Sequence, residues 1–222
     1  MKISCMKGKL MQGISNVSKA VSTKTTHPIL SCIFIEAENG NIKLTANDME
    51  IGIESYVEGT VIEEGKVAIE AKLLSDIVRK LPDSEIHMET NEDFKTTIKC
   101  EKSLFTIAGK SGEDFSSLPV VEKSKYITIS QFTLREIINQ TIFSISDSEY
   151  NNVMTGELFE VSNNRLRVVA IDGHRIAIRN VELKDESQDV KVIVPGKALS
   201  YISKIVNGGV DDDVNIYFAD NN

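Results

Sequence analysis

The chain contains no Trp, four Pro and three Cys, and it lacks any long apolar run. A helix that spans a membrane needs about 18 or more apolar residues in succession, so we expect no membrane segment. The stretch Met1–Cys5 alternates like a strand and has no apolar signal core. Cys5, Cys32 and Cys100 are widely spaced and form no paired motif. We therefore expect reduced thiols in a cytoplasmic protein, with no disulfide framework and no metal site.

Familiar catalytic motifs are also missing. The sequence has no phosphate-binding glycine loop, no Gly-x-Ser-x-Gly elbow and no His-Glu-x-x-His. One stretch could carry chemistry, because Asp172, His174 and Arg175 can be read as an acid, a base and an anion clamp. The alternative is that Asp172-Gly173 forms a hairpin turn between two strands.

A long internal repeat is the main positive feature. Residues 39–48 (NGNIKLTAND) return as residues 163–172 (NNRLRVVAID), at an offset of 124 positions, and Leu10 and Ile14 fall on Leu134 and Ile138. Self-similarity at a fixed offset indicates that one structural unit is used again. The repeat favours the turn interpretation of Asp172, because Asp48 occupies the same place in the first copy, which has no His or Arg there.

Each copy contains a second, weaker repeat, which gives four units of strand, helix and strands. In the first copy we expect helices at 8–21 and 71–81, with strands at 2–7, 30–37, 41–47, 51–60, 66–70, 85–90, 95–100 and 103–108. In the second we expect helices at 133–146 and 196–206, with strands at 126–130, 156–162, 165–171, 175–183, 190–194 and 213–218. Pro82 is expected to end the second helix.

This pattern predicts an α+β fold built from repeated domains. Each domain would contain two β-α-β-β-β units, with helices on one side and antiparallel sheets on the other. We expect a complete first domain at 1–118 and a second at 124–222. By the logic of the repeat, the second domain lacks its last two strands, so we expect a fragment that is cut at a surface turn.

Charge is sorted by predicted secondary structure. The helical segments 8–20, 71–81 and 196–207 each carry two more basic than acidic residues, and 133–146 is balanced. The whole chain has a net charge of -8, so the remaining residues are strongly acidic. If the helices share one side, that side is basic and suits phosphate groups, which all look alike to a lysine. The absence of interleaved aromatic residues favours duplex over single-stranded nucleic acid.

Repeated strand–helix–strand units with basic helices resemble the bacterial sliding clamp, the β subunit of DNA polymerase III. Four motifs carry the resemblance: His27–Leu30, Thr155–Glu160, Ala170–Ala177 and Val192–Lys197. The Asp-Gly-His-Arg stretch is the most specific part. That family builds a homodimer of three-domain subunits, whose six similar domains close into a ring around duplex DNA. The resemblance implies a non-catalytic processivity factor without a cofactor, with this chain matching the first domain and most of the second.

The resemblance also implies roles for individual residues. Lys24, Lys72, Ser148 and Asn152 would lie at the DNA, although this chain departs from relatives at Asn151 and Asn152. An apolar cleft would bind linear motifs of polymerase, clamp-loader and repair proteins, and its residues here are Met154, Ile171, Gly173, His174, Arg175 and Ile176. Thr106 and Ile107 would lie at the subunit interface.

Two alternatives stay open at this point. The first is an enzyme centred on Asp172, His174 and Arg175, which requires those side chains to converge in a closed pocket. The second is a scaffold that uses the same cleft and binds no DNA. For this alternative we expect Lys9, Lys24, Lys72 and Lys197 to be scattered, whereas DNA binding predicts that they share one face.

Overall fold

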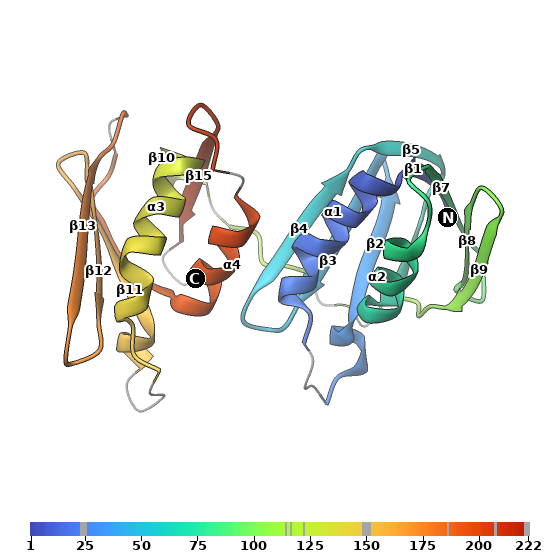
Figure 1. Ribbon diagram of the computed structural model, residues 1–222, viewed down its shortest axis with the longest axis horizontal. Helices are drawn as coiled ribbons and strands as arrows, with labels where there is room; N and C mark the ends of the chain where they lie inside the picture. Colours follow the sequence, from blue (N-terminus) through green and yellow to red (C-terminus); the bar gives the residue numbers. More distant parts are fainter. Residues whose placement is uncertain are drawn as a thin grey trace. The chain divides into compact units, whose positions relative to one another are not determined.

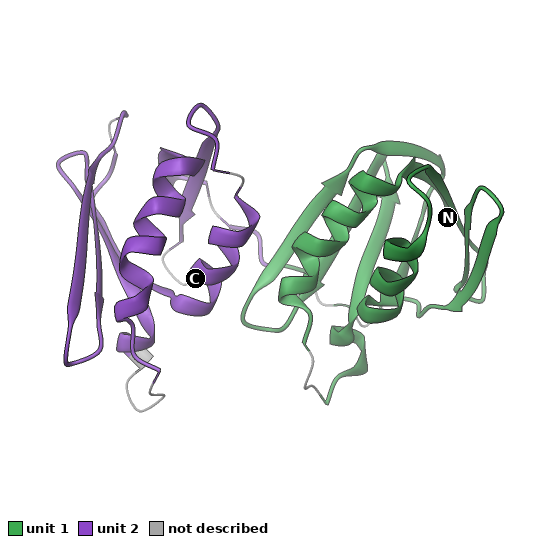
Figure 2. Ribbon diagram, viewed as in Figure 1, with its two compact units in different colours: residues 1–118 green, residues 119–222 purple. Residues whose placement is uncertain are grey.

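The computed structural model describes residues 1–22, 26–113, 115, 117–121, 123–147, 153–185, 187–206 and 208–219, together with the backbone of Asn152. The chain divides into two compact units, Met1–Leu118 and Pro119–Asn222 (Figure 2). Each unit has a separate hydrophobic core, which is characteristic of a domain. The predicted domain limits and the shortened second domain stay predictions.

The first unit contains two helices and two antiparallel sheets. Its elements are β1 (Lys2–Met6), α1 (Lys7–Val17), η1 (Ser18–Ala20), η2 (Pro28–Ser31), β2 (Cys32–Glu38), β3 (Asn41–Asn47), β4 (Gly52–Val57), β5 (Gly59–Glu63), β6 (Gly65–Glu70), α2 (Ala71–Lys80), β7 (Glu85–Thr90), β8 (Lys95–Cys100) and β9 (Ser103–Ala108). One sheet has the order β4-β3-β2-β6 and the other β5-β1-β7-β8-β9. The helices α1 and α2 pack against each other (Figure 1).

The helices bury the faces that their sequences predict. Leu10, Ile14 and Val17 of α1 are fully buried, because residues at this spacing lie on one side of a helix. On α2, Leu74, Ile77 and Val78 are buried in the same core. The helix ends at Lys80, before Leu81 and Pro82.

One predicted strand is wrong. The segment 51–60, expected as a single strand, is divided into β4 and β5, which belong to different sheets. The chain crosses between the sheets at Glu58, and Gly59 then lies against the carbonyl of Ser4 on β1. A side chain at Gly59 would collide with that carbonyl. Alternation of apolar and polar residues continues through the crossing, so the pattern alone does not reveal it.

The second unit follows the order of the first, but its described residues form no counterpart of β5, β8 or β9. Its elements are β10 (Lys125–Ser130), α3 (Gln131–Thr141), η3 (Ile142–Ser144), η4 (Asn152–Thr155), β11 (Gly156–Ser162), β12 (Arg165–Ile171), β13 (Ile176–Glu182), β14 (Val190–Pro195), α4 (Gly196–Ile205) and β15 (Asp213–Phe218). The sheet order is β13-β12-β11-β14, and β10 pairs with β15. The repeat therefore holds in three dimensions, and the predicted fold class is confirmed.

The start of α3 differs from the expected residue 133 because Ser130 caps the helix. Its Oγ accepts a hydrogen bond from the Thr133 N–H at 3.1 Å, which satisfies one of the free amides of the first turn. The α-helix ends at Thr141 and continues as η3 to Ser144. Among the described residues, no helix is long and apolar enough to cross a membrane.

Candidate interaction sites

The turn between β12 and β13 is organised around the Asp172 carboxylate. Its Oδ1 accepts hydrogen bonds from the N–H groups of His174 and Arg175, both at 3.0 Å. Its Oδ2 accepts from Arg175 Nε at 2.7 Å. Gly173 has a φ of +87°, which an L side chain rarely adopts. The hydrogen bond from the His174 N–H, followed by the Arg175 contacts, holds the pKa of Asp172 below its usual range.

The first copy builds the same turn without the basic residues. Asp48 Oδ1 accepts from the N–H groups of Glu50 at 3.1 Å and Ile51 at 2.8 Å. Met49 has a φ of +76° at the position equivalent to Gly173. In both copies the carboxylate organises its own backbone, as short polar side chains do in turns. The described contacts of Asp172 go to the turn backbone and to Arg175, so the geometry favours the turn over the enzyme interpretation.

Exposed apolar side chains surround the second turn. Ile171 and Ile176 are cross-strand partners, and they are 39% and 57% exposed. The guanidinium carbon of Arg175 lies 5.9 Å from the centre of the Phe143 ring, and this ring is also largely exposed. Sequence reasoning missed Phe143, although its place at the end of an amphipathic helix, off the buried stripe, was a usable signal. The arrangement offers apolar anchors beside a positive charge.

The other predicted cleft residue, Met154, lies on η4 just before β11. It is half-buried, and its carbonyl accepts a hydrogen bond from the Ser146 N–H at 2.8 Å. The predicted cleft residues between 171 and 176 therefore lie at one turn. Met154 is held elsewhere, by the hydrogen bond between its carbonyl and the Ser146 N–H. His174 is exposed, which suits a binding rim better than a buried base.

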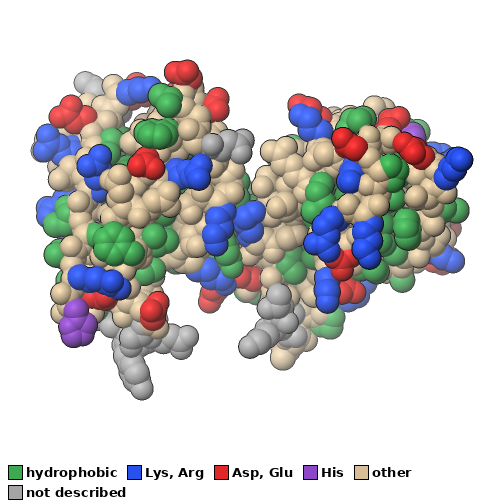
Figure 3. All heavy atoms as spheres, viewed as in Figure 1, with side chains coloured by type: hydrophobic (Ala, Val, Ile, Leu, Met, Phe, Trp, Pro, Cys, Tyr) green, Lys and Arg blue, Asp and Glu red, His purple; other side chains and the backbone are tan. Residues whose placement is uncertain are grey.

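Basic side chains project from the helices of the first unit. Lys72 and Lys80 are exposed on α2, and Arg79 pairs with Asp76 on the same helix. Lys9 of α1 forms an ion pair with Glu58 at 2.8 Å. Figure 3 shows Lys and Arg side chains gathered over α1 and α2. Lys9 and Lys72 lie on two helices that pack together. Lys24 lies outside the described residues and Lys197 belongs to the other unit, so a basic face shared by all four lysines stays a prediction.

The structure describes little of the other predicted DNA contacts. Lys24 and Ser148 lie outside the described residues, and only the backbone of Asn152 is described. In the second unit, Lys197 and Lys204 are exposed on α4, and Arg135 is exposed on α3. In the described part of the chain, no three His, Cys, Asp or Glu residues are grouped to hold a metal ion.

The strand β9 forms an edge of the five-stranded sheet. Thr106 is exposed on this edge, whereas Ile107 is only 8% exposed and belongs to the core. Leu104 and Phe105, which sequence reasoning missed, are exposed apolar residues on the same strand. An edge with exposed apolar side chains can accept another strand.

Family models match both units. The DNA polymerase III beta subunit, N-terminal domain, matches residues 1–119, and the central domain of that subunit matches residues 128–222. The beta sliding clamp of Staphylococcus epidermidis is 37% identical and is aligned with 100% of this chain and 60% of its own length.

Solved structures agree with the sequence matches. A crystal structure assigned as a DNA polymerase III beta subunit from Eubacterium rectale has a TM-score of 0.96 and 55% identity, over 100% of this chain and 60% of that one. The DNA polymerase sliding clamp of Bacillus subtilis has a TM-score of 0.94 and 31% identity, over 99% of this chain and 60% of that one. This chain thus spans about 60% of the length of these relatives. The chain belongs to the DNA polymerase III beta subunit family.

Proposed function

We propose that this chain acts as part of a DNA sliding clamp, which encircles duplex DNA as a ring dimer and tethers the replicative polymerase. The observation that carries the proposal is the pairing of two basic helices on one side of the first unit, opposite its sheets. Relatives named as sliding clamps support it. The proposed role involves no catalysis and no cofactor, and it places the protein in the cytoplasm.

The DNA contact is proposed to be electrostatic and independent of base sequence. Lys72 stands at the start of α2 and is exposed, so its ammonium group can reach a phosphate without reading a base. Lys24, Ser148 and Asn152 are proposed to add contacts from loops. Because phosphates are interchangeable, such contacts hold the protein on the duplex and still allow it to slide.

The turn at residues 171–176, with Met154, is proposed to bind short linear motifs of polymerase, clamp-loader and repair proteins. Ile171 and Ile176 offer apolar anchor points, and Arg175 adds a charge that can pair with an acidic motif residue. The carboxylate of Asp172 holds Arg175 in place at 2.7 Å. The exposed Phe143 ring extends the apolar surface on the other side of Arg175.

The dimer contact is proposed to use the free edge of β9, where Thr106 and Ile107 lie. Leu104 and Phe105 would supply the apolar side chains of the interface. Ile107 would contribute through its backbone, because its side chain is buried in the core.

The DNA contact is tested with Lys72→Gln and with Lys99→Gln as the matched control. Lys99 is equally an exposed lysine of the first unit, but it lies on the strand β8. Binding of a labelled duplex is measured by fluorescence anisotropy over a range of salt concentrations. Each lost phosphate contact reduces the magnitude of the slope of log K against log salt by about 0.9, and a ring dimer loses one such contact per subunit. We expect this change for Lys72→Gln only, and equal effects of both substitutions would contradict the proposal.

The tether is tested by retention on circular and linearised DNA after loading. A closed ring leaves linear DNA over its ends, so we expect retention at high salt on the circle alone. Equal retention on both would refute encirclement. Loss of duplex binding altogether, with motif binding intact, would favour the scaffold alternative.

A further inference from the structure

The first unit contains a pocket of about 560 Å³ whose walls come from three segments that lie far apart in the sequence. They are residues 27–30 at the start of η2, Met49 in the turn between β3 and β4, and residues 110–112 after β9. The apolar side chains that line this first-unit pocket are Pro28, Ile29, Leu30 and Met49. Ligand sites are typically pockets of this size, mainly apolar and with a few polar groups that orient the ligand.

Hydrogen bonds within the chain hold two of the walls together. The Leu30 N–H donates to the His27 carbonyl at 3.0 Å and fixes the first wall. The backbone of Lys110 pairs with Ala68 at the edge of β6 through two hydrogen bonds, at 2.8 and 3.0 Å. The Lys110 side chain then donates to the Pro28 carbonyl at 3.3 Å, which joins the third wall to the first. A pocket that is already formed costs a ligand little ordering of the protein.

Met49 forms the remaining wall in an unfavourable backbone conformation. Its φ is +76°, where the second copy has Gly173, and its N–H donates to Asn47 Oδ1 at 2.7 Å. The side chain is 68% exposed. Strain of this kind is concentrated at functional sites, and the flexible thioether of Met suits surfaces that bind varied partners. The first unit thus keeps an adaptable apolar side chain at the pocket in spite of a backbone cost.

The charge of the pocket favours an acidic group on its occupant. Lys110 contributes an ammonium group, whose printed side-chain partner is the neutral carbonyl of Pro28. The described residues that line the pocket include no carboxylate. An acidic residue of a ligand can therefore form a charge-assisted hydrogen bond with Lys110.

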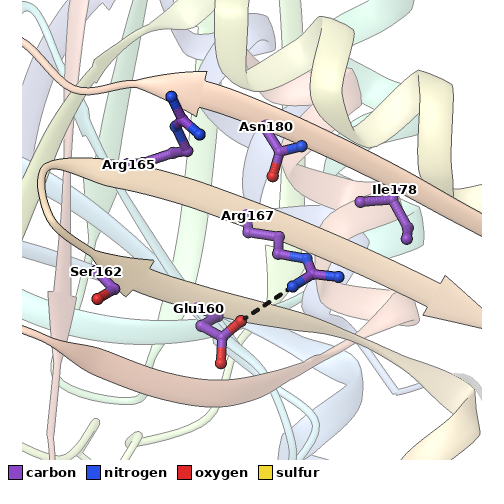
Figure 4. Close-up of a pocket in the computed structure, with 6 residues that line it drawn as sticks. All are labelled: Glu160, Ser162, Arg165, Arg167, Ile178 and Asn180. Carbon is purple, nitrogen blue, oxygen red and sulfur yellow. Dashed lines mark ion pairs between the residues drawn. The ribbon is translucent and has the colours of Figure 1, made fainter.

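A hollow in the second unit shows the opposite case (Figure 4). It measures about 450 Å³ and is lined mainly by polar residues of β11, β12 and β13. Its carboxylate, Glu160, already pairs with Arg167 at 3.9 Å and with Lys191 at 3.4 Å. Ile178 is the apolar residue among the described residues that line it. This hollow therefore offers a ligand neither apolar depth nor an uncompensated charge.

The internal repeat indicates which class of ligand the first-unit pocket takes. At the offset of 124 positions, Leu30 corresponds to Met154 of the proposed motif cleft. The same hydrogen bond holds both residues, since the Leu30 carbonyl accepts from the Ser22 N–H at 3.1 Å and the Met154 carbonyl from the Ser146 N–H at 2.8 Å. The first-unit pocket is thus the counterpart of that cleft in the other unit.

We propose that the first-unit pocket is a second site for linear motifs of partner proteins. An aliphatic side chain of the motif lies between Leu30 and Met49, and an adjacent acidic residue pairs with Lys110. The proposal rests on the proposed motif cleft, because the repeat supplies the class of ligand. The two sites differ in selectivity, since Ile51 takes the place of Arg175 and the cation comes from a different wall. One subunit can then hold two motifs at once, which raises the avidity for a partner that carries both.

The test uses the capped tripeptide acetyl-Leu-Glu-Leu-amide, in which the acid has an aliphatic neighbour on each side. The peptide is titrated to millimolar concentration into the whole chain, with isotope-labelled Met and Leu methyl groups. We expect saturable chemical-shift changes at Met49 and Leu30. Replacing both leucines of the peptide by Ala should weaken binding roughly tenfold or more. Replacing Glu by Gln should weaken it about threefold, as expected for an exposed ion pair.

Protein variants assign the binding to this pocket. Met49→Ala should weaken binding about fivefold, and its backbone strain is unchanged because Ala also carries a Cβ. Met6→Ala is the matched control, at another exposed methionine of the first unit, and should have no effect. Lys110→Gln should weaken binding of the Glu peptide about threefold and leave that of the Gln peptide unchanged.

Three results would overturn the inference. The first is the absence of shifts at Met49 and Leu30, and the second is an equal effect of Met49→Ala and Met6→Ala. The third is a change of these shifts with protein concentration in the absence of peptide, which would show that the pocket binds a second copy of the chain. Met154, labelled in the same sample, reports separately on the proposed motif cleft. Shifts at Met154 alone would refute the second site and support the cleft, whereas shifts at Met49 alone would support the second site and count against the cleft.

Discussion

Glu157 is a buried carboxyl group in the second unit, and its titration should control the stability of that unit. It lies near the start of β11 and is 0% exposed. Its Oε2 lies 3.0 Å from Thr141 Oγ1, and that hydroxyl also lies 2.8 Å from the carbonyl of Ile137. One hydroxyl proton cannot serve both acceptors. A protonated Glu157 resolves the conflict, because it can donate to Thr141 while Thr141 donates to Ile137.

Few groups around Glu157 stabilise its ionised form. Glu157 Oε1 is buried without a hydrogen-bond partner among the described residues, and so is the Ser144 hydroxyl. Burial raises the pKa of Glu157 from 4.5 to about 7, and the contact with Thr141 opposes this rise only in part. A shift of this size corresponds to about 3 kcal/mol between the two protonation states.

The sign of the effect follows from proton linkage. The folded protein binds the Glu157 proton more tightly than the unfolded chain, so this residue's contribution is most favourable below pH 4.5. The contribution declines as the pH rises from 4.5 to about 7, with a limiting slope of about 1.4 kcal/mol per pH unit. Above pH 7 the loss is complete and the contribution is constant. Between pH 5 and pH 8 we expect Glu157 to remove about 2.5 kcal/mol from the free energy of unfolding.

The assay compares the wild type with Glu157→Gln, which keeps the shape and cannot ionise. Urea unfolding is followed at pH 5 and pH 8 by tyrosine fluorescence. The chain has no Trp, and Tyr126, Tyr150, Tyr201 and Tyr217 all belong to the second unit, so the signal reports mainly on that unit. We expect Glu157→Gln to abolish most of the additional loss between the two pH values.

Glu160→Gln is the matched control, since Glu160 lies on the same strand and pairs with Arg167 and Lys191 on the outer face. It should leave the difference between pH 5 and pH 8 close to that of the wild type. If Glu157→Gln showed the wild-type difference as well, the carboxylate would be solvated in the folded state, and the argument from burial would be wrong.

Two further predictions concern the first unit and the paired turns. Phe115→Ala removes a buried ring that stacks on Phe34, and should lower the free energy of unfolding by about 3 kcal/mol. Circular dichroism during urea unfolding measures this loss, and a value near that of the exposed-edge control Phe105→Ala would contradict it. Met49→Gly relieves a left-handed backbone at φ +76°, whereas Gly173→Ala imposes a side chain at φ +87°. We expect opposite changes of about 1 kcal/mol, and changes of the same sign would refute the argument from backbone strain.

Much of the fold could be predicted because the chain repeats itself. The turn at Asn39-Gly40 returns as Asn163-Asn164, and all four residues adopt the positive φ that tight hairpins require. The strands β3 and β12 fall at the predicted residues for the same reason. The residue pattern of each strand and turn agreed with the internal repeat, so both indicated the same structure.

What could not be predicted depends on contacts between distant segments. The stacking of Phe115 on Phe34 joins residues that no periodic pattern relates. The crossing at Glu58 keeps the alternation of a single strand. The burial of Glu157, in contrast, could have been predicted from the repeat. It aligns with Ile33, which is fully buried, so the repeat already indicated that the carboxyl group points inward.

The two copies can be compared residue by residue, and their cores differ at one set of equivalent positions. Val17, Ala20 and Ile33 fill one site of the first core, where the second copy places Thr141, Ser144 and Glu157. A buried carboxyl group costs stability that Ile would supply, so the exchange weakens the packing beneath η3 and the start of β11. The same end of the unit carries Phe143 on η3 and the Arg175 side chain beside it. We therefore expect lower local stability next to the proposed motif cleft than at the equivalent site of the first copy, as is common where a surface must adapt to partners.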